Sequence, residues 1–195
     1  MFGPETIERV MVSSRDRLAA GATVPTFLPL PAERYARQRL AALVHAERNQ
    51  RDGTPGVLFL CLRSTGRSQM ALGWFKHLAG ERAVAWSAGS EPAGEIDPAV
   101  AGAMAEVGID ISAEFAKPWS NEMLEAADAV VTMGCGDACP VAPGKHYEDW
   151  RLPDPHGLGP DEVRRIRDDV ERRVRDLLDR LGVSARQRHQ VQKYQ

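Results

Sequence analysis

The sequence has almost no net charge and no long apolar run. It contains 25 basic and 27 acidic residues, for a net charge of -2, and the two signs are mixed along the chain. No overall field therefore attracts nucleic acid or an anionic membrane surface. No stretch approaches the ~18 apolar residues that cross a bilayer, and the first residues lack a basic region followed by an apolar one. We expect a cytoplasmic protein that binds neither nucleic acid nor membrane.

Cysteine is also scarce, with three residues at Cys61, Cys135 and Cys139. An odd number in a reducing compartment favours chemical or metal-binding roles over structural disulfides. The chain has 195 residues, of which 43% are hydrophobic, so it is long enough for one full domain and a small accessory segment. The places of the three cysteines are therefore the main guide to function.

Residues 1–54 are predicted to form a helical segment. Apolar residues recur at spacings of three and four over residues 7–18, which is typical of a helix with one buried face. Glycine and prolines interrupt residues 21–31, a second helix is predicted over 32–48, and residues 51–56 have the composition of a linker. We expect the apolar faces to pack on the following domain; dimerisation, partner docking and metalloid sensing are the alternatives.

Residues 55–182 show the alternation that is typical of an α/β domain. Apolar runs predict strands at 57–61, 83–86 and 129–133, and periodic patterns predict helices at 68–78, 97–107 and from about 160 to 181. Strands that alternate with helices form mostly parallel sheets. Residues 183–195 are polar and unpatterned, and we expect a frayed tail there.

The loop after the first predicted strand has the composition of an oxyanion site. Five residues separate Cys61 from Arg67, and a helix is predicted to follow. Such a loop can turn successive backbone N–H groups inward, the helix adds the positive end of its dipole, and Arg67 supplies a planar pair of donors. The same donors, together with the Ser68 hydroxyl, stabilise a thiolate. The predicted oxyanion-binding residues are Leu62, Arg63, Ser64, Thr65, Gly66, Arg67 and Ser68, with Arg63 at the rim. The alternative is that Cys61 simply ends a buried strand.

Displacement of an oxygen from phosphorus or arsenic needs an acid opposite the sulfur, because the leaving group must be protonated. Asp154 is the candidate, since Pro153 and Pro155 stiffen the backbone on either side of it. Asp149 is the second choice. An ordinary proline-rich turn is the alternative interpretation.

Four further stretches extend the pattern: GRSQMA at 66–71, SAGSEP at 87–92, AADAVVTMGCGDACP at 126–140 and DWRLPDP at 149–155. With them, residues 55–182 resemble the arsenate reductases of the low-molecular-weight protein tyrosine phosphatase fold family. The resemblance implies a four-stranded parallel sheet flanked by helices, with Cys61 as nucleophile, Arg67 as oxyanion ligand and Asp154 as acid. The chain differs from the family at Ser64, where asparagine is usual, and in the close spacing of Cys135 and Cys139.

In the thioredoxin-coupled branch that the chain resembles, a second cysteine attacks the nucleophile's sulfur to release arsenite, and a third closes a disulfide with the second. Cys135 and Cys139 stand at the matching places. On one helical turn their Cα atoms would be ~6 Å apart, within the range of a disulfide, and Gly134 and Gly136 give the segment freedom to move. A metal site made of both cysteines with His146 or His156 is the alternative.

The resulting prediction is an arsenate reductase that uses Cys61, Cys135 and Cys139, with no metal or tightly bound cofactor. Its substrate would be arsenate or a phosphate-like oxyanion, and its reductant thioredoxin, or else mycothiol or glutathione. We expect a monomer or a weak homodimer. Two alternatives stay open: a phosphatase, which needs no cysteine pair, and a non-catalytic oxyanion or metalloid sensor.

Overall fold

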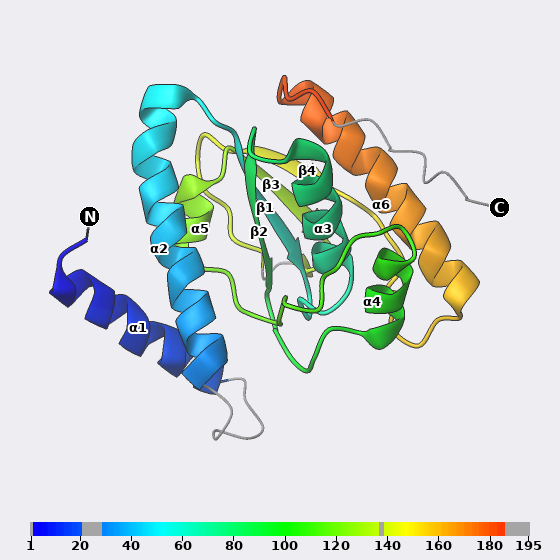
Figure 1. Ribbon diagram of the computed structural model, residues 1–195, viewed down its shortest axis with the longest axis horizontal. Helices are drawn as coiled ribbons and strands as arrows, with labels where there is room; N and C mark the ends of the chain where they lie inside the picture. The colour runs from blue at the N-terminus through cyan, green and yellow to red at the C-terminus, as the bar shows by residue number, and fades with distance from the viewer. Residues whose placement is uncertain (1, 21–28, 137–138, 186–195) are drawn as a thin grey trace.

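The computed structural model describes residues 2–20, 29–136 and 139–185. Its centre is a four-stranded sheet made of β1 (Gly56–Cys61), β2 (Val84–Gly89), β3 (Ala129–Met133) and β4 (His146–Asp149). The strand order is β2-β1-β3-β4, and every pairing is parallel. The expected four-stranded parallel sheet is therefore confirmed (Figure 1).

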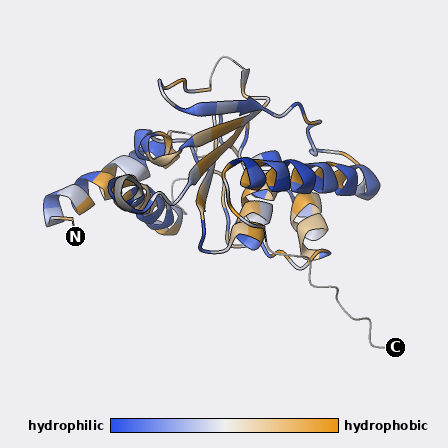
Figure 2. Ribbon diagram, turned by 90° about the horizontal axis from the view of Figure 1, so that it is seen from above, coloured by the Kyte–Doolittle hydropathy of each residue, from blue (hydrophilic) through white to orange (hydrophobic). Residues whose placement is uncertain are grey.

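Helices cover both faces of the sheet (Figure 1). One face carries α3 (Arg67–Ala79), α4 (Pro98–Ala105) and α6 (Pro160–Arg180), and the other carries α2 (Pro29–Asp52) and α5 (Asn121–Ala126). Side chains alternate across β1: Phe59 and Cys61 face the first set, whereas Leu58 and Leu60 face the second. All six residues of β1 are buried. This explains its apolar run, because a strand that is covered on both faces has no exposed side for polar residues. In Figure 2 the central strands are mostly orange, and the outer helix α6 is mostly blue.

The two N-terminal helices, α1 (Pro4–Ala19) and α2, are part of this packing. Tyr35 and Ala42 of α2 are fully buried in the same apolar cluster as Trp86 of β2. Helix α1 packs mainly on α2 and reaches the domain through polar contacts. The N-terminal segment thus covers one face of the sheet, mainly through α2.

The structure departs from the predicted boundaries at several places, among them the start of α2 at Pro29 and the end of β2 at Gly89. Helix α2 extends to Asp52, so the predicted linker at 51–56 is shorter than expected and runs directly into β1. Strand β4 and helix α5 had no predicted counterpart, since they are only 4 and 6 residues long. Val183, assigned to the tail, is buried in the core, while residues 186–195 lie outside the described part of the chain. Within the described residues, no helix is both long enough and apolar enough to span a membrane.

Candidate active site

The candidate site lies where β1 ends and α3 begins. Cys61 is the last residue of β1, and its side chain is a buried free thiol. The backbone N–H of Ser64 donates to Cys61 Sγ at 3.3 Å, and Ser68 Oγ lies 3.1 Å from the same sulfur. The loop therefore curls back over the sulfur, and the hydroxyl of Ser68 is within reach of it as the sequence predicts. In this structure the Cys61 thiol donates to Ser68 Oγ. Once the thiol has lost its proton, the Ser68 hydroxyl can donate to the sulfur together with the Ser64 N–H, and both then stabilise the negative charge.

Two glycines allow other segments to approach this loop closely. A Cβ on Gly89, at the end of β2, would lie 2.7 Å from the carbonyl oxygen of Leu62. A Cβ on Gly66 would lie 2.7 Å from the ring of Pro155. The segment that contains Asp154 is thus packed directly on the oxyanion loop.

Arg67 joins this segment to the loop. Its side chain is buried; Nη1 donates to the carbonyl of Leu152 at 3.2 Å, and Nη2 donates to Asp154 Oδ2 at 3.3 Å. The Asp154 side chain is half exposed, and its Oδ1 accepts the backbone N–H of His156. The structure therefore brings Arg67 and Asp154 together, although 87 positions separate them in the sequence.

Asp149, the second choice for the acid, has different partners. Its Oδ1 accepts a hydrogen bond from Thr132 Oγ1 at 3.0 Å, and its Oδ2 lies 3.7 Å from Arg151. These contacts place it at the end of β4, and its recorded partners do not include the Cys61 loop.

Cys135 and Cys139 form a disulfide, with their Cα atoms 5.7 Å apart. The spacing agrees with the expected ~6 Å, but Cys135 follows β3 in a loop and not in an α-helix. Gly134, just before Cys135, has a φ of +75°, and a Cβ there would lie 2.9 Å from Arg67 Nη1. The residue that precedes the disulfide therefore packs against the arginine of the oxyanion loop. For the alternative metal site, His146 contacts Glu148 and His156 contacts Asp97, and the described residues contain no group of three or more His, Cys, Asp or Glu side chains that could hold a metal ion.

Gln69 is a part of the site that residue-by-residue reasoning missed, although it lies within the quoted GRSQMA stretch. It is fully buried, and its Nε2 donates to the backbone oxygen of Ser64 at 2.8 Å and to Ser64 Oγ at 3.2 Å. Ser64 has a φ of 59°, and it is the sole non-glycine residue in the described part of the chain with a positive value. The amide of Gln69 holds this unfavourable turn in place.

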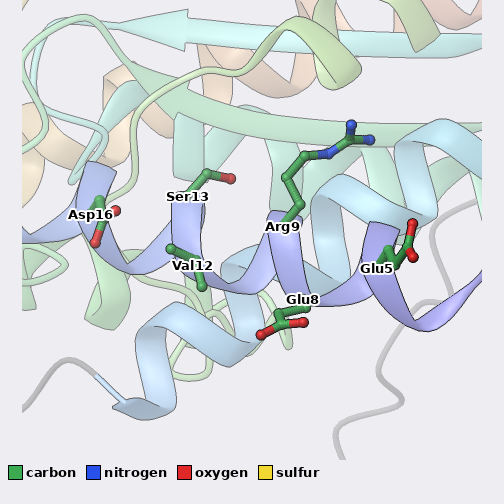
Figure 3. A pocket seen from close by; sticks show the side chains of 6 residues that line it. All are labelled: Glu5, Glu8, Arg9, Val12, Ser13 and Asp16. Carbon is green, nitrogen blue, oxygen red and sulfur yellow. The ribbon is translucent and has the colours of Figure 1, made fainter.

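A concave region lies along α1, where it is lined by Glu5, Glu8, Arg9, Val12, Ser13 and Asp16 (Figure 3). Its volume is about 450 Å³. The lining contains three carboxylates and one guanidinium, so its net charge is negative and unfavourable for an oxyanion. All six lining residues belong to α1, and the oxyanion loop contributes none of them.

The contact between Gly134 and Arg67 leads to a test. Gly134→Ala is expected to weaken the binding of inorganic phosphate by about tenfold, because the new methyl group displaces the guanidinium. Gly144→Ala is the matched control, since its φ of +76° is equally unfavourable for alanine but a Cβ there would meet nothing within 4 Å. Calorimetric titration of both variants measures the effect. Equal affinities in the two variants would contradict the assigned contact.

A cysteine and an arginine around a curled loop between a buried strand and a helix define an enzyme class that acts through a thiolate on tetrahedral oxyanions. The model of the low molecular weight phosphotyrosine protein phosphatases matches residues 56–188, and the chain belongs to this family. Residues 1–44 match a separate model, the N-terminal domain of protein-tyrosine-phosphatase-like proteins.

Individual proteins that the chain resembles have names more specific than that of the family. The chain is similar to the thioredoxin-dependent arsenate reductase of Corynebacterium glutamicum, at 41% identity and a TM-score of 0.81, over 93% of this chain and 89% of that one. An arsenate reductase from Halalkalibacterium halodurans is 40% identical over 133 residues, which are 63% of this chain and 94% of that protein. Arsenate reductase 2 of Staphylococcus saprophyticus is 38% identical over 127 residues, 63% of this chain and 95% of that protein. The resemblance stated from the motifs is therefore confirmed at the level of the family.

Proposed function

We propose that this protein reduces arsenate to arsenite with electrons from an external thiol reductant. One observation carries the proposal: Cys135 and Cys139 form a disulfide, and Gly134, the residue just before Cys135, packs closely against Arg67 of the loop that holds the free thiol of Cys61. A phosphatase needs Cys61, Arg67 and the acid Asp154, but no cysteine pair. A redox-active pair at this place is needed only if the reaction moves electrons.

The reaction that these residues support is balanced at each step. The Cys61 thiolate attacks arsenic(V), and one arsenate oxygen leaves as water after it takes a proton from Asp154. The Cys135 thiolate then attacks Cys61 Sγ, the electron pair of the sulfur–arsenic bond stays on arsenic, and arsenite leaves. Cys139 attacks Cys135 Sγ, which frees the Cys61 thiolate and forms the disulfide seen in the structure. A dithiol reductant returns the two electrons.

Binding of the oxyanion falls to residues 62–68 in this proposal. The inward backbone N–H groups and the start of α3 supply positive potential. Arg67 is already fixed by its bond to the carbonyl of Leu152, so it needs little reorganisation when the anion arrives. The bound anion takes over Nη2 from Asp154, and the freed, half-exposed carboxylate takes up a proton from solvent, which it then donates as the acid.

The reductant is proposed to be thioredoxin, since the structural relative from Corynebacterium glutamicum bears that dependence in its name. Mycothiol and glutathione are the alternatives. We also propose the cytoplasm as the site of action, because a three-thiol relay needs a compartment that keeps thiols reduced.

The decisive measurement is NADPH oxidation by the purified protein with thioredoxin and thioredoxin reductase, with and without arsenate. We expect oxidation that depends on arsenate and is absent with Cys61→Ser, because a serine hydroxyl neither ionises at neutral pH nor forms a disulfide. A parallel assay with p-nitrophenyl phosphate measures the rival activity. Ester cleavage without arsenate reduction would make the protein a phosphatase, and phosphate binding without either reaction would make it a sensor. Arsenate reduction that occurs with mycothiol or glutathione but not with thioredoxin would contradict only the proposed reductant.

A further inference from the structure

Lys117 is a buried cation close to the oxyanion loop. The side chain is fully buried, and its Nζ donates to Ser87 Oγ at 3.3 Å, to the carbonyl of Phe115 at 3.1 Å and to Glu114 Oε2 at 3.4 Å. Burial lowers the pKa of Lys117 to about 8, although the carboxylate of Glu114 raises it and Lys76 adds a smaller lowering. Removing an ammonium group from water is costly, so its position needs an explanation.

A continuous chain of hydrogen bonds leads from this amine to the Cys61 sulfur. Ser87 Oγ donates to Gln69 Oε1 at 3.1 Å, and Gln69 Nε2 donates to the Ser64 backbone oxygen at 2.8 Å. The Ser64 N–H donates in turn to Cys61 Sγ at 3.3 Å. Each of the three intermediate residues is fully buried, and in such surroundings hydrogen bonds polarise one another.

The polarity of this chain depends on the lysine. An ammonium group has three donors and no acceptor, so the Ser87 hydroxyl must accept from it and donate onward. That hydroxyl proton fixes Gln69 Oε1 on the side of Ser87, and the amide Nε2 then faces Ser64. Without the lysine, the Ser87 hydroxyl could turn round, and the Gln69 amide would be held only by its bonds to Ser64 and to the carbonyl of Phe115 at 3.3 Å. A turned amide would place an oxygen against the backbone oxygen of Ser64 and would release the turn that brings its N–H to the sulfur.

Hydrogen bonds from the N-terminal helices hold the segment that carries Lys117. Arg34 Nη1 donates to the carbonyl of Ala113 at 3.3 Å, before the lysine. After it, the carbonyl of Trp119 accepts from Arg17 Nη1 at 3.1 Å and from Tyr35 OH at 3.4 Å. Residues 113–119 are therefore fixed at both ends by α1 and α2.

We propose that Lys117 is a positioning residue that orients the Cys61 loop through Ser87 and Gln69, and that α1 and α2 hold the segment that carries it. The proposal deepens the proposed function, because it concerns the same nucleophile. It also gives the N-terminal helices a role in the site itself. The test of this proposal does not depend on arsenate reduction, so the role of Lys117 and the proposed function can fail separately.

The test compares Lys117→Met with Lys76→Met in full-length protein in which Cys135 and Cys139 are both serine. Methionine matches the length of lysine but has no donor and no charge. Lys76 also bonds Glu114, at 2.7 Å, but its side chain is 55% exposed, which makes it a matched control. The readouts are the pH midpoint of Cys61 alkylation by iodoacetamide and the affinity for inorganic phosphate.

Lys117→Met is expected to raise the alkylation midpoint by about one pH unit and to weaken phosphate binding about tenfold, because a thiolate and an anion both lose an oriented donor. Lys76→Met should change neither. If Lys117→Met does not fold, Ser87→Ala breaks the same chain at its middle and is expected to shift the midpoint in the same direction. Midpoints equal to that of the parent protein in the folded variants would overturn the assignment.

The part played by the N-terminal helices is tested with the double variant Arg17→Ala/Arg34→Ala. We expect a smaller upward shift of the same midpoint, since the backbone of residues 113–119 is loosened while Lys117 is kept. Arg15→Ala is the control, because Arg15 lies on α1 and contacts only its exposed neighbour Asp16 among its recorded partners. An unchanged midpoint in the double variant would refute this part and leave the assignment of Lys117 standing.

Discussion

Cys139→Ser is expected to complete the first turnover of arsenate reduction and then to stop, with steady-state NADPH oxidation at the rate of the assay without enzyme. The first two attacks need only Cys61 and Cys135. Without the third thiol, the product is a disulfide between these two residues, whose side chains are only 2% and 5% exposed. An external dithiol must touch the sulfur that it attacks, so such a buried disulfide is reduced slowly. Cys139 is half-buried and more accessible.

The experiment mixes the reduced variant with excess arsenate, counts the arsenite released per protein molecule, and maps the disulfide by mass spectrometry without reduction. One arsenite per molecule and a Cys61–Cys135 disulfide are expected. Cys135→Ser is the matched control, because it also keeps two thiols but lacks the one that the proposed relay uses to attack Cys61, and it should release no arsenite. Full steady-state activity of Cys139→Ser with thioredoxin would refute the three-thiol relay.

The parts of the candidate site whose positions could be anticipated from the sequence are those made by local structure. Cys61, Ser64 and Ser68 lie within eight consecutive residues between a fully apolar strand and a helix, so the loop geometry follows from one stretch of chain. Asp154 could be found because two prolines flank it, and its approach to Arg67 then follows from the order of the parallel strands. The catalytic roles of these residues stay predictions until they are measured.

Lys117 could not have been found in this way. A lone lysine is usually a solvated surface residue, and nothing in its neighbours marks it as fully buried. Its burial results from contacts with Ser87, which is 30 positions away, and from carbonyls held by helices that begin about a hundred positions earlier. Strand β4 was missed for a related reason: only two of its four residues are even half-buried, so it has no apolar pattern. Long-range polar contacts leave no periodic signal in a sequence.

The largest effect on stability is expected at Arg39, which joins α1, α2 and α5. Its Nη2 and Nε contact the two carboxylate oxygens of Glu122 at 2.6 and 3.1 Å, and Nη1 donates to Ser13 Oγ and Ser14 Oγ at 2.7 and 3.0 Å. The two charged side chains are only 6% and 18% exposed. Burial raises the pKa of Glu122, but hydrogen bonds and the charge of Arg39 outweigh this and lower it from 4.5 to about 2.

Arg39→Met is therefore expected to lower the free energy of unfolding by about 3–5 kcal/mol at pH 7, because it leaves the Glu122 carboxylate buried without its partner. Urea unfolding followed by circular dichroism measures the change. Arg37→Met is the control: Arg37 pairs with Glu33 on the same helix, but their side chains are 76% and 45% exposed, and the expected loss is at most ~0.5 kcal/mol. The double variant Arg39→Met/Glu122→Leu should lose less than Arg39→Met alone, since the stranded charge is gone.

Acidification gives an independent check on the same pair. A carboxyl group whose pKa falls from 4.5 in the unfolded chain to about 2 in the folded protein contributes its full stability above pH 4.5 and loses it as the pH approaches 2. The wild-type protein should therefore lose stability across this window faster than the double variant, which lacks the group, and the gap between the two should narrow. A gap that stayed constant from pH 7 to the acid end of the window would show that the Arg39–Glu122 pair does not hold the N-terminal helices against the domain through its charge.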